Sequence, residues 1–276
     1  MPELPRNIIF LHVPKAAGST LRQILLRQYR EEETYRVSTD SSLQASIEQF
    51  RDLLPEERKS VRCVTGHGTF GLHKDLFGST EYITLLRDPV ERVISNYYYV
   101  RRSPGHRLYD DVVGQQMSLR DYVSSEINPQ LENGMTRVVS GANRKAPDED
   151  TLVQAKENLR EHFGVVGTVE RFDETVILLR KRYGWNRIGY RKRNVTSSRP
   201  TKREIPNETR RLIEENNRLD AQLYRHASSR LQEALAGIGN LDAKLRHLRF
   251  RCQVRTMYAQ TRRAAGKLVR SILPHS

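Results

Sequence analysis

The feature that most constrains this chain is a short apolar run that ends in a small glycine-containing loop and continues as a helix. Residues 7–13 (NIIFLHV) have strand character, residues 14–20 (PKAAGST) form the loop, and from Leu21 onward apolar residues recur at helical spacing. In such a unit the loop amides and the first helical turn point at an anion above the strand end. The sequence therefore predicts phosphate binding at the edge of a sheet.

Three further apolar runs, at residues 61–65, 82–86 and 165–169, have the length and composition of strands. The second of these runs leads to Asp88, a good N-cap, and Pro89, which suits the first position of a helix. Strands that alternate with helices predict an α/β fold whose parallel sheet is covered on both faces.

The remaining segments are assigned by composition and periodicity. We expect a variable connection at 31–60, a mobile loop at 103–114, helices at 152–163 and 174–183, and an almost wholly helical chain after Pro206. We therefore predict a main α/β domain over residues 1–235 and a basic helical extension over residues 236–276.

Composition limits the expected cellular location of the chain and the kinds of partner that it can bind. No run of eighteen apolar residues occurs, and residues 1–6 do not resemble a signal peptide, so a cytoplasmic location is expected. Cys63 and Cys252 lack any zinc-ligand spacing, and we expect two buried, reduced thiols. The net charge of +14 calls for anionic partners, although no sequence motif typical of nucleic-acid binding is present and no nucleic-acid partner is expected.

The loop at 14–20 has residue types that suit an anion. Lys15 supplies a point charge, Gly18 permits close approach of the backbone, and Ser19 and Thr20 offer donors at a helix start. The string differs from the GxxxxGK[ST] loop of nucleotide hydrolases. The alternative interpretation is an ordinary helix start with an exposed lysine.

A second segment, residues 87–99 (RDPVERVISNYYY), can direct Arg87 and Ser95 toward another phosphate beside the first loop. The alternative is that Arg87 and Arg92 pair with the neighbouring acids of the same helix on a solvated face.

Six strings, PKAAGST, TGH, RDPVERVISNYYY, NGMTRVVSG, VVGTVERFD and RNVTSSRP, occur in an order that resembles the carbohydrate sulfotransferases of the uronyl and heparan sulfate 2-O-sulfotransferase group. The resemblance runs from residue 8 to about residue 225. It implies a P-loop nucleotide-kinase-like, three-layer domain with a central parallel sheet. It also implies 3′-phosphoadenylyl sulfate (PAPS) as sulfuryl donor, adenosine 3′,5′-bisphosphate as product, and no required metal.

The resemblance also assigns roles to individual residues. It makes His67 the catalytic base, a role that suits a side chain with a pKa near neutrality. It makes Lys15 the cation that stabilises the leaving bisphosphate. His12 and His73 are weaker candidates for catalysis. The donor ligands implied are Lys15, Ala17, Gly18, Ser19, Thr20, Arg87, Ser95, Arg191 and Asn194, and the acceptor contacts are Asn133, Thr136 and Arg137. The family often has Gln where Met135 stands, so the acceptor contacts differ here.

The last 36 residues contain nine Lys or Arg and one acid, a net charge of +8, and an apolar stripe at Leu241, Leu245, Leu248 and Cys252. A helix of this kind suits contact with a membrane surface, a polyanion or a partner helix, or simply packs on the domain.

The function predicted is transfer of a sulfuryl group to a hydroxyl of a carbohydrate. Two alternatives share parts of the pattern: a metal-dependent P-loop-like kinase, and a non-enzymatic module that binds polyanions.

Overall fold

The computed structural model describes residues 6–37, 43–142, 146–191 and 199–272; at positions 43, 44, 46 and 262–272 only the backbone is considered. Asn194, one of the predicted donor ligands, lies outside the described residues.

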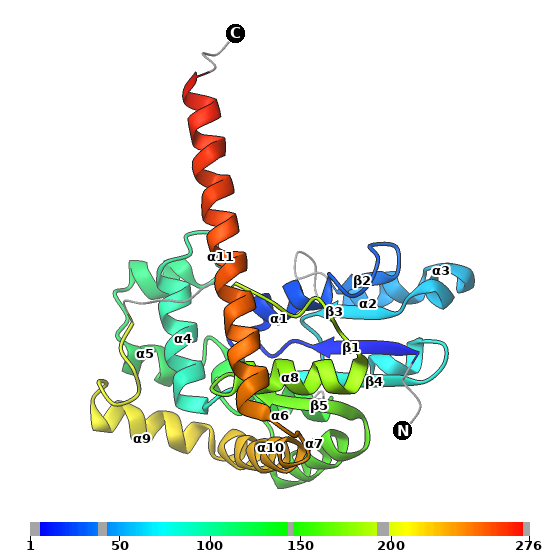
Figure 1. The fold of residues 1–276 in the computed structure, drawn as a ribbon. Helices are drawn as coiled ribbons and strands as arrows, with labels where there is room; N and C mark the ends of the chain where they lie inside the picture. Colours follow the sequence, from blue (N-terminus) through cyan, green and yellow to red (C-terminus); the bar gives the residue numbers. More distant parts are fainter. Residues whose placement is uncertain (1–5, 38–42, 143–145, 192–198, 273–276) are drawn as a thin grey trace.

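A five-stranded parallel sheet forms the centre of the molecule, with strand order β2-β3-β1-β4-β5 (Figure 1). The strands are β1 (Asn7–Leu11), β2 (Thr34–Val37), β3 (Cys63–Gly66), β4 (Thr80–Leu86) and β5 (Phe163–Thr168). Leu11 lies opposite Gly66 of β3 and Thr84 of β4, so the carboxyl ends of the three middle strands meet at one edge. Ligands bind at this edge in open parallel sheets.

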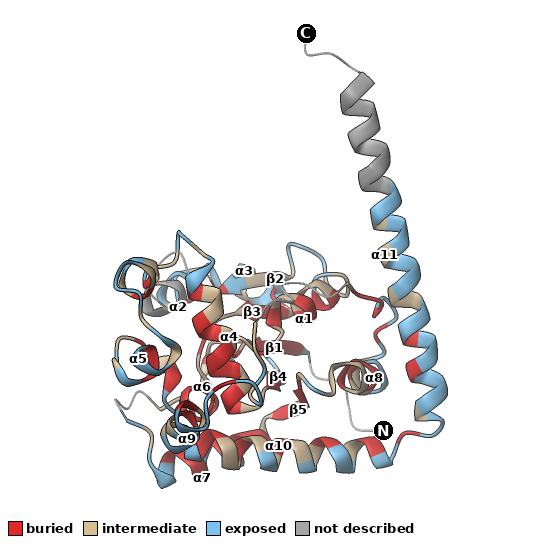
Figure 2. Cartoon of the chain, turned by 90° about the vertical axis from the view of Figure 1, so that its left-hand side faces the viewer, coloured by how far each residue is buried: buried red, intermediate tan, exposed pale blue. Residues whose placement is uncertain are grey.

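Helices cover both faces of the sheet, which confirms the predicted three-layer α/β fold. Figure 2 shows α1 and α8 on one side and α6 and α7 on the other. The α-helices are α1 (Gly18–Leu25), α2 (Leu43–Arg51), α3 (Pro55–Ser60), α4 (Pro89–Arg101), α5 (Leu119–Ser124), α6 (Gly134–Ser140), α7 (Glu149–Glu161), α8 (Phe172–Tyr183), α9 (Asn207–Asn216), α10 (Arg218–Ala236) and α11 (Leu241–Ile272). Short 3-10 helices occur at η1 (Leu72–Asp75) and η3 (Pro129–Leu131).

Four strands were predicted and all four are present, within a few residues of the predicted ends. Every residue of β1 is buried, as expected of a parallel strand covered on both faces. β2 was missed, because its four residues, TYRV, lie at the sheet edge, where only Val37 is buried, and have no continuous apolar run. The predicted connection at 31–60 therefore contains a strand as well as two helices.

The segment 103–114, predicted as a mobile loop, is partly ordered structure. It contains the π-helical turn η2 (Asp110–Gly114), and Leu108 and Val112 are buried in a second apolar cluster with residues of α4 and α5. The prediction was wrong because the apolar residues are too few to give a periodic signal beside the many turn formers.

A buried polar hub joins α4, α6 and α10. Arg92 and Asp220 form an ion pair with an N–O distance of 3.3 Å, and both side chains are almost completely buried. The Asp220 carboxylate also accepts bonds from the backbone N–H groups of Met135 and Thr136 at the start of α6. Arg92 therefore does not lie on a solvated helix face, as one reading of the sequence suggested.

The last helix, α11, packs against α8 at its beginning and then projects beyond the body of the molecule (Figures 1 and 2). Leu245 and Leu248, which lie inside the predicted extension, are buried in the main core. Cys63 is buried and Cys252 is half-buried, and both are free thiols. Among the described residues, no helix is both long and apolar enough to cross a membrane.

Candidate active site

The loop between β1 and α1 has an unusual backbone that presents its amides at the sheet edge. Lys15 and Ala17 have φ values of 67° and 55°, in the left-handed region that residues with a side chain rarely adopt. Such conformations concentrate at functional sites, where the surrounding structure holds them. Gly18 is required for a different reason: a Cβ there would lie 1.8 Å from the His12 ring. The loop is thus shaped by contacts that the sequence string alone does not reveal.

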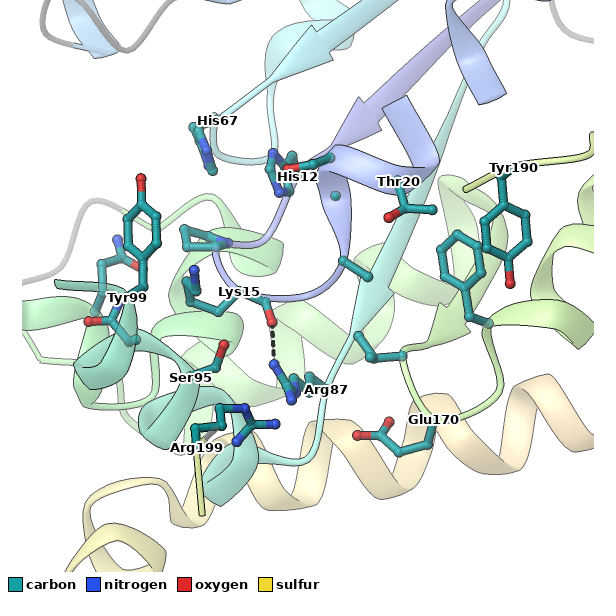
Figure 3. Close-up of a pocket in the computed structure, with 18 of the residues that line it drawn as sticks. His12, Lys15, Thr20, His67, Arg87, Ser95, Tyr99, Glu170, Tyr190 and Arg199 are labelled. Carbon is teal, nitrogen blue, oxygen red and sulfur yellow. Dashed lines mark hydrogen bonds between the residues drawn. The ribbon is translucent and has the colours of Figure 1, made fainter. Parts of the chain in front are cut away.

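A cavity of about 1000 Å³ lies beyond the carboxyl ends of β1 and β4 (Figure 3). Its wall includes eight of the predicted site residues: Lys15, Ala17, Gly18, Ser19, Thr20, His67, Arg87 and Ser95. The structure therefore brings together the loop at 14–20 and the segment that begins at Arg87, as the sequence predicts.

Lys15 lies at the centre of this cavity in a strongly cationic environment. Burial, together with the positive charges of Arg102, Arg87 and Arg199, lowers the pKa of Lys15 to about 7. Its Nζ lies 3.7 Å from the ring centroid of Tyr99, and it makes no ion pair with any carboxylate of the described chain. A bound anion would supply the missing countercharge.

Arg87 follows β4 directly and is held in the cavity wall. Its Nη1 donates to the carbonyl of Lys15 at 3.0 Å, and its Nη2 lies 3.5 Å from Glu91. Glu91 also accepts a bond of 2.8 Å from Arg199, so one carboxylate serves two guanidinium groups. Nε of Arg87 is buried and has no hydrogen-bond partner among the described residues. The two guanidinium groups therefore share one carboxylate and keep a net positive charge, and Arg87 has one donor that the described chain does not use.

His67 stacks on His12, with 4.1 Å between the ring centroids, at the edge of the same cavity. Burial lowers the pKa of His67, and a hydrogen bond to the His12 backbone raises it by a smaller amount. Burial, with the nearby charge of His67, lowers the pKa of His12 to about 3. Both rings are thus neutral near pH 7, and Nδ1 of His67 has no partner in the described chain. A neutral imidazole with a free nitrogen can accept a proton.

The acids in the cavity wall are already engaged by other groups. Glu170 accepts bonds from the backbone N–H of Asp88 and from the Tyr224 hydroxyl. Asp173 accepts bonds from the Tyr190 hydroxyl and from Arg249 of α11. These acids position parts of the wall, and they leave the Lys15 region cationic.

Several wall residues were not predicted as site residues. Tyr190 and Phe172 meet edge to face, with their ring centroids 4.9 Å apart, and Arg199 was included only as part of the string RNVTSSRP. Asn128 belongs to a buried network with Asn96 and Tyr122, in which its Nδ2 donates to the Tyr122 hydroxyl at 2.8 Å. These residues come from separate helices and loops, and no local sequence signal links them to the loop at 14–20.

The predicted acceptor residues lie elsewhere. Asn133 caps α10, accepting bonds from the N–H groups of Leu219 and Asp220, and the Thr136 hydroxyl donates to Asp220. Neither they nor Arg137 line the cavity. Asn133 and Thr136 thus make structural bonds outside this cavity wall, and their contact with an acceptor stays a prediction.

Two other predicted candidates do not reach the cavity. Arg191 is half-buried but does not contribute to the cavity wall. His73 lies away from the cavity on η1, with Nδ1 2.9 Å from the Tyr82 hydroxyl. In the described residues no group of three or more His, Cys, Asp or Glu side chains is placed to hold a metal ion.

The parallel sheet and its cationic loop define a P-loop-like α/β protein with a binding site for an anionic ligand. The chain belongs to the galactose-3-O-sulfotransferase family, whose model matches residues 2–265. The predicted relationship to carbohydrate sulfotransferases is confirmed, with galactose-3-O-sulfotransferases as well as a uronyl 2-sulfotransferase among the relatives.

The similarities to individual proteins are distant. Galactose-3-O-sulfotransferase 2 of Sus scrofa is 30% identical over 201 residues, which are 65% of this chain and 49% of that protein. The Homo sapiens galactose-3-O-sulfotransferase 2 is 28% identical over 281 residues, 94% of this chain and 67% of that one. The chain thus spans about half to two thirds of the length of these relatives. The crystal structure of mouse sulfotransferase SULT7A1 complexed with PAP aligns with a TM-score of 0.36 and 11% identity, covering 76% of this chain and 63% of that chain.

Proposed function

We propose that this protein transfers a sulfuryl group from PAPS to a hydroxyl of a carbohydrate, with His67 as general base and Lys15 stabilising the bisphosphate. The observation that carries the proposal is the cavity itself, in which Lys15, Arg87 and Arg199 gather beside a neutral histidine in a chain of a sulfotransferase family.

The residues present fit a nucleotide that carries two phosphate groups. The cavity volume of about 1000 Å³ is at the upper end of ordinary ligand pockets. Lys15 lacks a carboxylate partner in the described chain, and Nε of Arg87 is buried without an acceptor there. Lys15 and the N-terminal turn of α1 would hold the 5′ end, and Arg87 with Ser95 the 3′-phosphate.

The aromatic pair Tyr190 and Phe172 is our candidate for the nucleotide base. Figure 3 places Tyr190 at one end of the cavity, His67 and Tyr99 at the other, and Lys15 between them. Aromatic faces stack on purine rings irrespective of sequence context. The base would then lie at the Tyr190 end and the acceptor at the His67 end.

When bound, PAPS supplies an activated sulfuryl group. His67 takes the proton that the acceptor hydroxyl loses as its oxygen bonds to sulfur. Lys15 and Arg87 offset the negative charge that increases on the phosphate side as the old S–O bond breaks. His12 packs on His67 and keeps its ring in place, and burial lowers the pKa of His12 to about 3, so the His12 ring stays neutral at the pH of the reaction.

For the acceptor we propose a galactose 3-hydroxyl, following the names of the relatives, with a uronyl 2-hydroxyl as the second candidate. Besides Tyr99, which lies at the His67 end, the cavity wall includes Asn128 and Gln130. Oε1 of Gln130 is buried and has no partner in the described chain. An aromatic face with adjacent amides suits a sugar, which presents both a C–H face and hydroxyl groups.

The proposal is tested first by binding and then by transfer. Adenosine 3′,5′-bisphosphate should raise the melting temperature, since a ligand at a hundredfold excess over its Kd stabilises the folded state by about 2.7 kcal/mol. ATP with Mg²⁺ and adenosine 5′-phosphate should give smaller shifts.

In the transfer test, the labelled sulfuryl group should pass from PAPS to a terminal galactose, and 3-deoxygalactose should be inactive as acceptor. A larger shift with ATP and Mg²⁺ would favour the kinase alternative. No shift with any nucleotide, combined with salt-sensitive heparin binding, would favour the polyanion-binding module.

A further inference from the structure

The projecting part of α11 has an apolar face that no other described part of the chain covers. Phe250, Val254, Met257 and Tyr258 are 62%, 47%, 66% and 70% exposed. Their spacing of four, three and one residues places them on one side of the helix. This group, called the outer face of α11, accounts for half of the eight large exposed hydrophobic residues found in the described chain.

The outer face is distinct from the face that packs on the domain. Leu245 and Leu248 are buried in the main core, and Cys252 is half-buried, accepting a bond from the N–H of Tyr190. At 100° per residue, Val254 lies roughly opposite to these three residues around the helix axis. Packing of α11 on the protein therefore does not explain the outer face.

Positive charge borders the outer face, and no acid follows Asp242 in the sequence. Arg246 and Arg255 are exposed, and four further Lys or Arg lie between residues 260 and 270. A helix with exposed aromatic and aliphatic residues on one side and basic residues beside them is typical of a helix that lies in the interface of a membrane.

We propose that the projecting part of α11 binds the surface of an anionic lipid membrane through its outer face. The basic residues attract anionic headgroups, and the apolar side chains enter the boundary between headgroups and acyl chains. From Cys252 to Ile272 the helix is about 30 Å long, enough to lie along the surface over several turns.

Charge complementarity favours a membrane over the other occupants. A second copy of the chain would bring together two helices whose projecting parts have the same positive charge and no acids to pair with it. A glycan or other polyanion would satisfy the basic residues but leave four large apolar side chains in water. Only the lipid surface matches both properties.

The test is sedimentation of the full chain with vesicles of equal parts phosphatidylcholine and phosphatidylserine, beside vesicles of phosphatidylcholine alone. The wild type should sediment with the anionic vesicles and far less with the neutral ones. A variant with Phe250→Ser, Met257→Ser and Tyr258→Ser keeps every positive charge, and we expect its partition coefficient to fall at least tenfold. The matched control is a variant with Leu54→Ser and Val153→Ser, which removes similarly exposed apolar residues elsewhere and should bind like the wild type.

Equal melting temperatures of the variants and wild type would show that all are folded. Undiminished sedimentation of the triple variant would overturn the proposal and indicate binding by charge alone. Failure of the folded wild type to sediment would also overturn it. So would a dimer, detected by analytical ultracentrifugation, that the triple variant abolishes. Bisphosphate binding should be the same in all these proteins, since none of the substituted residues lines the cavity.

Discussion

Lys15 lies in surroundings that oppose its own charge. Burial and three arginines lower its pKa to about 7, and a left-handed backbone holds it over the sheet edge. A charged Lys15 in these surroundings is stabilised only when an anion is bound. This is expected of a residue in an anion-binding site. The same residue therefore links ligand binding to pH.

We predict that binding of adenosine 3′,5′-bisphosphate weakens as pH rises above about 7, by up to about tenfold per pH unit over the range in which Lys15 changes charge. The bound anion raises the pKa of Lys15. The contribution of Lys15 to the affinity is therefore complete below its pKa in the free protein, and it is lost as the pH rises through its pKa in the complex. Calorimetry near pH 8, in two buffers of different ionisation enthalpy, should reveal proton uptake on binding.

The control for this linkage is Lys15→Arg, because a guanidinium stays charged at these pH values. The variant should bind without proton uptake from this position. Equal uptake in both proteins would show that another group titrates, and no uptake in the wild type would contradict the lowered pKa.

His67 is predicted to act on the acceptor and not on the donor. His67→Ala should reduce transfer by about 10²–10⁴-fold while leaving bisphosphate affinity unchanged. Because burial lowers the pKa of His67, protonation of this ring should reduce kcat/KM of the wild type on the acid side of the pH profile, below about pH 6.5, whereas the loss above about pH 7 belongs to Lys15. The comparison protein is His247→Ala, an exposed histidine on α11. Undiminished transfer by the His67→Ala variant would show that His67 is not the general base.

Helices α6 and α10 cap each other through side chains. Asn133 accepts from the first N–H groups of α10, and Asp220 accepts from those of α6. Asn217 joins the same hub, accepting from the backbone N–H of Asn133 and donating to the carbonyl of Leu131. These bonds fix the helices beside η3, whose Gln130 lines the cavity.

Removing the carboxylate of the hub should destabilise the fold strongly. Asp220→Ala leaves Arg92 buried without its ion-pair partner, and we expect a loss of about 3–5 kcal/mol in the free energy of unfolding. Urea denaturation measures the loss, and Asp242→Ala, at an exposed position, supplies the comparison. A small effect would mean that Arg92 reaches water or another acceptor once the carboxylate is absent.

At the scale of the whole molecule, α11 has two parts with different roles. Its first turns belong to the main core, although the sequence analysis placed them in a separate extension, and its later turns project. The boundary predicted at residues 235 and 236 falls at the end of α10, before the chain contributes its last core residues.

Truncation tests this division. A chain that ends at Asn240 loses the burial of Leu245 and Leu248, and we expect its free energy of unfolding to fall by about 3–6 kcal/mol. A chain that ends at Gln260 keeps both residues and should unfold at nearly the wild-type urea concentration. Equal stability of the two chains would support the boundary as first predicted.

The sequence by itself determined the parallel α/β class, the strand-loop-helix at residues 7–25, and the position of the Arg87 segment beside that loop. Local signals were sufficient for these features because strand runs, helix caps and loop residues act over a few positions. The resemblance carried by six short strings added the sulfotransferase relationship. β2 was not predicted, because its short sequence has no apolar run and its place in the sheet depends on pairing with β3 and on packing of Tyr35 against Phe50 of α2.

Only the tertiary structure decided which polar residues belong to the site. Asn133 and Thr136 stand in a motif that suggested substrate contact, yet they are buried against α10. Tyr190 enters the cavity from a segment 175 positions after Lys15. The lowered pKa of Lys15 likewise depends on burial and on Arg102, Arg87 and Arg199, which the fold brings close to it. Burial and electrostatic fields are sums over all neighbours in space, so they are fixed only when the chain has folded.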